Sequence, residues 1–204
     1  MIFKACRQEK VSRRTSCDSL SIIEALSDVL VQQPDILNLS LSGPRDAIIE
    51  RLLREVYRDG IVVLAAVDES RGLAGSFPAN MEEVIAVGTA INLGGGVANV
   101  LLAPGTDMLT TAPGATYGFK SGSSIATAYV SGIVALMKER NPALSNADVY
   151  ADLRASTRFN ENELPVVDMC LAVNTAIESA HECERTPSMA LSGQSVTNSF
   201  DLAN

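Results

Sequence analysis

Hydrophobic and polar positions along the first half of the chain form blocks that predict alternating strands and helices. The blocks that predict strands span residues 1–5, 36–41, 61–67, 83–89 and 99–103. Between them, apolar residues at helical spacing predict helices over residues 19–33 and 46–58. Residues 61–67 are apolar throughout, which is typical of a strand covered on both faces. This order predicts right-handed βαβ units and therefore an α/β fold of three layers, αβα, around a largely parallel sheet.

The second half of the chain predicts helices more strongly than strands. Residues 124–140 are apolar nearly all round a helix, so we expect a buried central helix that ends at Asn141-Pro142. Two more helices are predicted, one capped by Ser145 or Asn146 and one starting at Asp168. From Thr186 onward Ser, Thr and Asn dominate, which predicts a mobile tail. We therefore expect one domain over residues 1–180 and a polar C-terminal tail over residues 181–204.

Composition places the chain among globular proteins. Of its 204 residues, 47% are hydrophobic and 20% are charged. The net charge of -8 argues against nucleic acid or an anionic membrane as a partner, because both attract basic surfaces. No apolar run approaches the roughly 20 residues of a membrane span. The N-terminus does not resemble a signal peptide, so the protein is either cytoplasmic or, with a leader upstream, secreted or periplasmic.

Four cysteines and one histidine limit the metal chemistry. Cys6, Cys17, Cys170 and Cys183 form no C-x-x-C pair, so we expect no zinc site. No loop is dense enough in acidic residues to bind calcium, and we expect neither a metal nor a cofactor. The spacing allows two local disulfides, Cys6–Cys17 and Cys170–Cys183. Four reduced, partly buried thiols are the alternative.

The segment with the clearest chemistry runs from residue 121 to residue 137 and reads SGSSIATAYVSGIVALM. A serine here opens a buried helix after a glycine, at the positive end of the helix dipole. Backbone N–H groups that lack helical partners then point toward its hydroxyl and could stabilise a developing oxyanion. A simple N-cap serine is the alternative.

Residues 122–132, GSSIATAYVSG, resemble the nucleophile motif of the subtilisin-like serine peptidases, which is usually Gly-Thr-Ser-Met-Ala-x-Pro-His-Val-x-Gly. The resemblance places the nucleophile on Ser124. Further segments resemble the family in the expected order, covering about residues 1–178: ILNLSL at 36–41, SFPA at 76–79, VIAVG at 84–88 and LAPG at 102–105. It implies that Ser40, Leu41, Ser42 and Gly43 bind an extended polypeptide substrate by strand addition.

Two departures from the family pattern bear on activity. The family's Asp and His precede the part seen here, and the resemblance implies that this N-terminal part of the fold is missing. The single histidine, His181, lies in the polar tail, where a solvated role is expected. In addition, Asp68 falls where the family has an oxyanion-binding Asn. Asp68 either takes that position or lies exposed in a rearranged loop.

Three functions remain in competition at this stage. The first is a serine endopeptidase of the subtilisin type whose present chain carries Ser124 but an incomplete triad, and which is inactive alone. The second is a pseudopeptidase that binds peptides or serves as an interaction module. The third is an unrelated α/β binding domain. An exposed sheet edge favours self-association or pairing with the missing N-terminal part.

Overall fold

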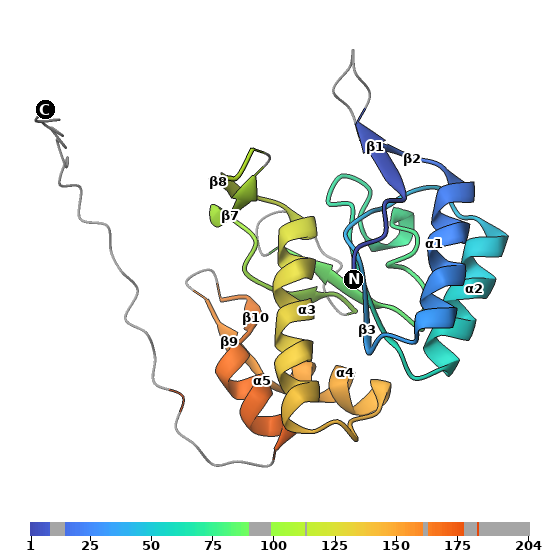
Figure 1. Cartoon of the computed structure of the whole chain (residues 1–204). Helices are drawn as coiled ribbons and strands as arrows, with labels where there is room; N and C mark the ends of the chain where they lie inside the picture. Colours follow the sequence, from blue (N-terminus) through green and yellow to red (C-terminus); the bar gives the residue numbers. More distant parts are fainter. Residues whose placement is uncertain (9–14, 90–98, 113, 161–162, 178–182, 184–204) are drawn as a thin grey trace, which may run out of the picture.

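A six-stranded sheet lies between two layers of helices in the computed structural model, which describes residues 1–8, 15–89, 99–112, 114–160, 163–177 and 183 (Figure 1). The strands follow the order β3 (Ile36–Leu39), β4 (Val62–Ala66), β5 (Ile85–Gly88), β6 (Leu101–Leu102), β10 (Pro165–Val167) and β9 (Thr157–Phe159). Every neighbouring pair is parallel except β10 with β9. The predicted three-layer fold with a largely parallel sheet is confirmed.

Strand β4 shows why this sequence forms a buried sheet. Its side chains alternate between the two faces, as the pleat requires. Val63 and Ala65 join one apolar cluster, and Val62 and Leu64 join the other. All five β4 residues are buried, which explains the uninterrupted apolar run in the sequence.

Five helices cover the two faces. The first apolar cluster is completed by α1 (Ser19–Gln32) and α2 (Ala47–Arg58). The second is completed by α3 (Ser123–Arg140), α4 (Asn146–Ala155) and α5 (Met169–Ala176). The expected cap of α4 is confirmed, because the Ser145 hydroxyl and the Asp148 carboxylate form a reciprocal capping box. At α1 the cap is instead Asp18, whose carboxylate accepts from the backbone N–H of Ser21.

The strand predicted over residues 1–5 is wrong. These residues form neither helix nor strand, and the first strand, β1 (Cys6–Gln8), pairs antiparallel with β2 (Thr15–Cys17). The two strands lie outside the main sheet and are joined by the Cys6–Cys17 disulfide. Apolar residues at the N-terminus indicated a strand, but the backbone ladder forms where the two cysteines face each other.

The description of residues 124–140 as a buried central helix is also wrong in part. Helix α3 packs one side on the sheet, with Val130 and Met137 fully buried. Its other side is open: Ala128 and Gly132 are exposed, and Leu136 keeps 40% of its surface accessible. Apolar residues all round the helix do not reveal whether a neighbour covers the outer side.

Several other elements were not predicted, among them β9, β10, a hairpin before α3 and a short turn. Strands β7 (Met108–Ala112) and β8 (Thr116–Lys120) form a separate hairpin that leads into α3, and a short 3-10 turn, η1, spans Leu73–Gly75. The hairpin points its large apolar side chains outward, since Leu109, Tyr117 and Phe119 are each more than 60% exposed. In a half-buried strand, the large apolar side chains usually face the core instead of the solvent.

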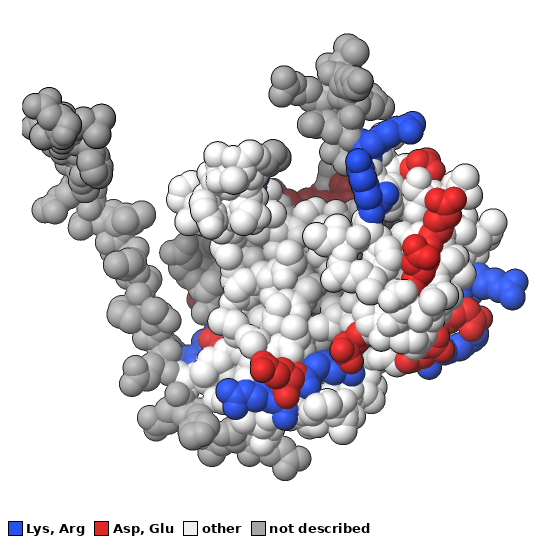
Figure 2. Space-filling view, viewed as in Figure 1, with Lys and Arg blue, Asp and Glu red and all other residues white. Residues whose placement is uncertain are grey.

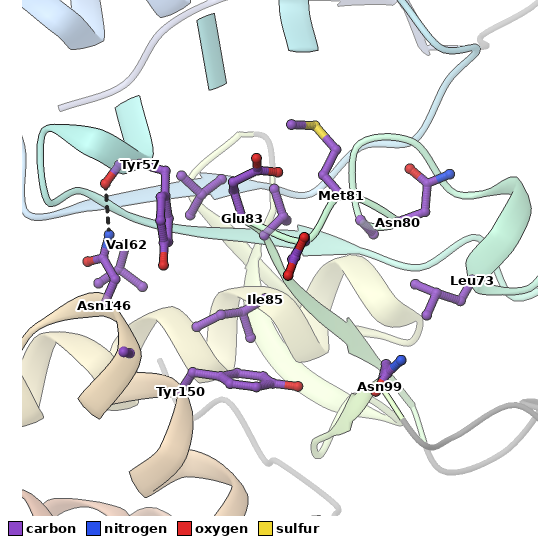
Figure 3. A pocket seen from close by; sticks show the side chains of 15 residues that line it. Tyr57, Val62, Leu73, Asn80, Met81, Glu83, Ile85, Asn99, Asn146 and Tyr150 are labelled. Carbon is purple, nitrogen blue, oxygen red and sulfur yellow. Dashed lines mark hydrogen bonds between the residues drawn. The ribbon is translucent and has the colours of Figure 1, made fainter. Parts of the chain in front are cut away.

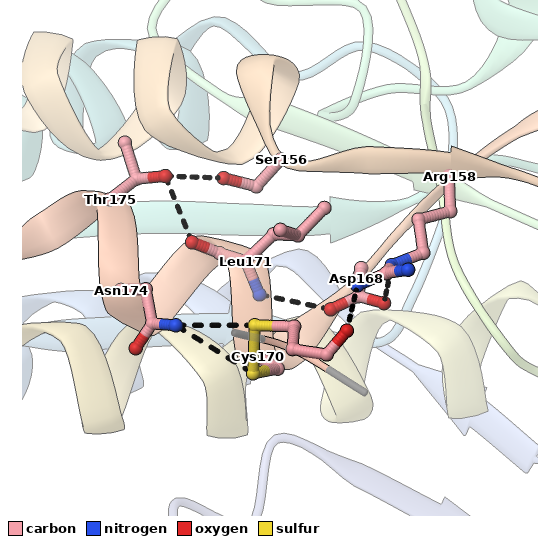
Figure 4. Close-up of a disulfide and its surroundings, with 8 residues drawn as sticks. Ser156, Arg158, Asp168, Cys170, Leu171, Asn174 and Thr175 are labelled. Atoms are coloured by element: carbon pink, nitrogen blue, oxygen red, sulfur yellow. Dashed lines mark hydrogen bonds and ion pairs between the residues drawn. A yellow bond between two sulfur atoms is a disulfide. The ribbon is translucent and has the colours of Figure 1, made fainter. Parts of the chain in front are cut away.

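The far end of the sheet is held by a second disulfide. Cys170 at the start of α5 bonds to Cys183, and Arg158 of β9 forms an ion pair with Asp168 at 2.6 Å (Figure 4). Both local disulfides are therefore present in the structure. The predicted tail, apart from Cys183, lies outside the described residues. No helix in the described part of the chain is long and apolar enough to cross a membrane.

Candidate active site

Ser124 lies in the first turn of α3, and two glycines allow the approach to it. Gly122, the residue before the helix, has φ of 132°, a conformation that favours glycine. Its N–H donates to the carbonyl of Gly105 at 2.8 Å. A Cβ on Gly105 would lie 2.9 Å from Cβ of Ala126 and 3.0 Å from the carbonyl oxygen of Gly122. The APG turn and the nucleophile motif therefore fit together only with glycine at both positions.

Three hydroxyl groups attach the start of α3 to the carboxyl ends of the central strands. The Ser124 hydroxyl donates to the carbonyl of Ser40 at 3.2 Å, and the Ser40 hydroxyl donates to the carbonyl of Ser124 at 2.9 Å. The Ser123 hydroxyl donates to the carbonyl of Val67 at 2.6 Å. Functional groups of parallel sheets gather at the carboxyl ends of strands, and Ser124 lies at such a position.

An open cavity of about 370 Å³ surrounds Ser124. It is lined by residues 40–42, 66–70 and 122–124. It therefore brings together five residues singled out from the sequence: Ser40, Leu41, Ser42, Asp68 and Ser124. Gly43 is not part of this lining, and its N–H donates to the carbonyl of Phe77 at 2.9 Å.

Asp68 stands in the cavity as an acceptor of hydrogen bonds. Its carboxylate accepts from the hydroxyl of Ser70 at 2.6 Å and from the N–H of Ser70 at 3.0 Å. Arg71 lies 3.4 Å from the same group. The Ser70 hydroxyl bond is the main reason that the pKa of Asp68 is lowered, so the group is ionised at neutral pH. An ionised carboxylate has no proton to donate to an oxyanion.

Sequence reasoning missed the residues that support this site. Ser123 positions the helix through Val67. Fully buried Ser76 holds the loop after β4, because its hydroxyl accepts from the N–H of Asp68 at 2.8 Å and donates to the carbonyl of Gly72 at 2.7 Å. The carboxylate of Glu69 accepts from the hydroxyl of Thr89. All three side chains are polar and sit in loops or at helix starts, and only the contact between distant segments reveals their role.

The ionisable side chains that line this cavity are Asp68 and Glu69. The Ser124 hydroxyl donates to the backbone carbonyl of Ser40, whereas Asp68 accepts from Ser70 and Glu69 accepts from Thr89. His181 lies outside the described residues. Among the described residues, no group of three or more His, Cys, Asp or Glu could hold a metal ion. No His or Lys side chain is among the described residues that line this cavity.

A larger cavity lies at the other end of the sheet, near the amino ends of β4 and β5 (Figure 3). Its volume is about 670 Å³, and Tyr57, Ile85, Asn146 and Tyr150 are among the residues around it. The amide of Asn146 donates to the carbonyl of Tyr57 at 3.2 Å. Because ligands of open parallel sheets bind at carboxyl ends, the smaller cavity at Ser124 is the better candidate for catalysis.

Comparison with known proteins gives a consistent result. The model of the subtilase family matches residues 8–166. The chain is 32% identical to Subtilisin E of Bacillus subtilis (strain 168) over 155 residues, covering 69% of this chain and 40% of that protein. It is also 32% identical to the Subtilisin of Bacillus pumilus over 152 residues, covering 68% of this chain and 54% of the relative. The chain thus spans about half the length of these relatives, or less.

Among solved structures, the chain is similar to the structure of the prenylagaramide maturation protease PagA, with a TM-score of 0.68. The match covers 81% of this chain and 70% of that one at 20% sequence identity. At this identity, the likeness supports the fold alone.

Proposed function

The chain belongs to the subtilase family, and we propose that its activity is peptide-bond hydrolysis as a serine endopeptidase, with Ser124 as the nucleophile that forms an acyl-enzyme. The observation that carries the proposal is the position of Ser124, in the first turn of α3 within a cavity at the carboxyl ends of β3 and β4. The first N–H groups of a helix lack partners within it, which suits those of Ser123 and Ser124 to stabilise an oxyanion beside the hydroxyl.

The substrate in this proposal is an extended polypeptide that pairs with Ser40, Leu41 and Ser42. These residues follow β3 and border the cavity, so a peptide strand added there would pass Ser124. Gly43 contributes by turning the chain away, through its bond to Phe77. The peptidase domain would cover residues 1–180, with residues 181–204 as a tail.

We further propose that the chain is catalytically silent by itself. A triad mechanism needs a base that accepts the serine proton, and no histidine is among the described residues that line the cavity. In subtilisin, a member of this family, losing the nucleophile or the base lowers kcat by roughly 10⁶-fold.

The bond from Ser124 to the Ser40 carbonyl also favours a second candidate, a pseudopeptidase that binds peptides. In that case the hydroxyl would serve only to attach α3 to β3. The first candidate is preferred because the whole cavity, with its peptide-pairing segment, is retained around Ser124.

A chimera tests the nucleophile without depending on any other part of the protein. The aligned segment of Subtilisin E would be replaced by residues 121–132 of this chain, and hydrolysis of a chromogenic peptide would be measured. We expect activity that Ser124→Ala abolishes, with Ser131→Ala, a serine of the same segment outside the cavity lining, as the matched control that retains activity. A folded chimera without activity would contradict the endopeptidase proposal and support the pseudopeptidase.

A further inference from the structure

The two disulfides of the protein lie in different kinds of structure. Cys6–Cys17 joins two directly paired residues of the β1–β2 hairpin, which is a two-stranded sheet of its own. Cys170–Cys183 joins the second residue of α5 to the chain 13 residues later. None of the four cysteines is buried, so a thiol in solution can reach both disulfides.

Cys170 lies where a helix stabilises negative charge. Helix α5 begins at Met169, and Asp168 caps it by accepting from the N–H of Leu171 at 2.9 Å. The positive end of a helix dipole lowers the pKa of a cysteine thiol placed there. The carboxylate of Asp168 opposes this effect, but its charge is compensated by Arg158, whose Nε lies 2.6 Å away. The helix therefore favours Cys170 as a thiolate when the disulfide opens.

A side-chain amide points at the two sulfur atoms (Figure 4). Nδ2 of Asn174 lies 3.2 Å from Sγ of Cys183 and 3.8 Å from Sγ of Cys170. Asn174 follows Cys170 by one turn of α5, so this donor stays beside Cys170 when Cys183 moves away. Because a hydrogen bond to a charged acceptor is stronger than one to a neutral acceptor, the amide stabilises the thiolate more than the disulfide.

The surroundings of Cys6–Cys17 stabilise a thiolate less directly. Cys17 belongs to β2 and precedes the residue that caps α1, so it lies outside the first turn of that helix, where the dipole acts. Lys4 and Arg7 are exposed, and Figure 2 shows Lys and Arg side chains at the surface beside the β1–β2 hairpin. Charges that face solvent are screened by salt. Of the two disulfides, Cys170–Cys183 is therefore the more readily reduced.

We propose that Cys170–Cys183 is a redox switch, which a dithiol in solution opens and a disulfide in solution closes. In the opening reaction, a thiolate of the dithiol attacks Sγ of Cys183, the bond between the two cysteines breaks, and Sγ of Cys170 leaves as a thiolate. The second thiol of the dithiol then attacks the sulfur bound to Cys183 and forms a cyclic disulfide, and its proton passes to Cys183. Two electrons pass from the dithiol to the cysteine pair, and one proton goes to the solvent.

Opening this disulfide detaches Cys183 from α5. Two of its described contacts then remain, from Nδ2 of Asn174 to its sulfur and from Nη2 of Arg158 to its carbonyl at 2.9 Å. Arg158 belongs to the edge strand β9 and also holds Asp168 at the cap of α5. The redox state of the cysteine pair is thereby coupled to the β9 edge of the sheet. The switch does not depend on peptide hydrolysis.

The first experiment compares the two disulfides within one molecule. The oxidised chain is equilibrated with mixtures of reduced and oxidised dithiothreitol, free thiols are blocked with N-ethylmaleimide, and mass spectrometry measures the blocked fraction of each cysteine. We expect the equilibrium constant for reduction to be roughly tenfold larger, or more, for Cys170–Cys183 than for Cys6–Cys17. In the form with Cys170–Cys183 alone reduced, hydrogen exchange of residues 157–159 should be faster. Equal reduction of both disulfides, earlier reduction of Cys6–Cys17 or unchanged exchange would overturn the proposal.

The second experiment tests the thiolate. Asn174→Leu replaces the amide by an apolar side chain of similar shape, and it should lower the equilibrium constant for reduction roughly fivefold or more. Thr175→Val is the matched control, because Thr175 is the next residue of α5 and its hydroxyl bonds to Leu171 and Ser156 instead of to sulfur. Equal constants for the two variants would contradict the role of Asn174.

A pH profile keeps the test independent of how well these variants fold. In the parent chain with Cys170–Cys183 alone reduced, alkylation of Cys170 by iodoacetamide should reach half its maximal rate about one pH unit lower than in the urea-unfolded chain. The same profile in both states would overturn the proposal, because the folded helix would then not stabilise the thiolate.

Discussion

The two edge strands of the central sheet, β9 and β3, have different surroundings. At one edge, β9 has three residues, runs antiparallel, and is held by the Arg158–Asp168 ion pair and the nearby Cys170–Cys183 disulfide. At the other, β3 runs parallel to its neighbour beside an apolar groove that leads to Ser124. Short strands and charges are common means of blocking edge-to-edge association. The β9 edge shows both features, whereas the β3 edge borders the apolar groove.

The largest expected effect is a difference in the free energy of unfolding between substitutions on the covered side and on the open side of α3. Met137 is fully buried against the sheet, whereas its neighbour Leu136 is 40% exposed on the open side of the helix. Met137→Ala should lower the free energy of unfolding by about 2–5 kcal/mol, through lost burial and a cavity. Leu136→Ala should cost about 0.5 kcal/mol or less. Urea unfolding measures both, and equal losses would show that the open side is covered after all.

The next effect concerns the stabilised edge. Replacing Cys170 and Cys183 by Ala removes a crosslink between residues 13 apart, which should cost about 3 kcal/mol by loop-closure entropy. Replacing Cys6 and Cys17, which are 11 apart, makes the matched comparison. Their hairpin lies outside the main sheet, so its loss should disturb the core less. If removal of the Cys6–Cys17 disulfide lowered the free energy of unfolding more than removal of Cys170–Cys183, the β9 edge would not be the edge that a disulfide stabilises most.

A third effect tests the chemistry at the open edge. Asp68 is ionised because hydrogen bonds from Ser70 lower its pKa, and its charge opposes an oxyanion at Ser124. In an active enzyme in which the N-terminal part of a subtilisin completes this chain, Asp68→Asn should raise kcat roughly 10- to 100-fold, part of the range attributed to one oxyanion donor in subtilisin. Asp107→Asn, which lies outside the cavity lining, is the control. An unchanged rate for Asp68→Asn would remove Asp68 from the oxyanion site.

The smallest effect is a pH dependence at the start of α2. The Asp46 carboxylate caps this helix by accepting from the N–H groups of Ile49 and Ile48, and the Ile49 bond, a hydrogen bond with the side chain of Ser19 and the Ile48 bond lower its pKa. Its stabilising contribution is complete above the unfolded pKa of about 3.9 and disappears as the pH falls through the lower folded value. Asn caps helices as well as Asp, so Asp46→Asn should match the parent at pH 7. Below pH 4 the urea midpoint of Asp46→Asn should fall less steeply with pH than that of the parent protein. If the two midpoints fell in parallel, the Asp46 carboxylate would not be the source of this pH dependence.

The sequence predicted the elements whose burial follows a regular period. Strands β3, β4 and β5 and helices α1 and α2 were found because their apolar residues face a core within the chain. Strands β9 and β10 escaped notice because three residues give no readable alternation. The β7–β8 hairpin escaped because Leu109 and Phe119 point outward. A pattern of apolar residues does not show which element, if any, packs against the surface that they form.

The candidate site was predictable only where a motif marked it. Ser124 and Asp68 could be found from their place in the motifs, and the structure brings both to one cavity. The bonds from Ser123 to Val67 and from Ser124 to Ser40 join segments 56 and 84 residues apart. No local pattern encodes such contacts. The acceptor role of Asp68 likewise depends on Ser70 and appears only in the folded loop.

The most direct test of a nucleophile that is present but not activated is fluorophosphonate labelling of the purified, folded chain, read by intact mass and by mapping the labelled residue. Ser124→Ala and Ser123→Ala serve as controls. We predict no labelling of the isolated chain. Stoichiometric labelling at Ser124 would contradict this account, because it would show that these 204 residues already contain the base that activates the serine.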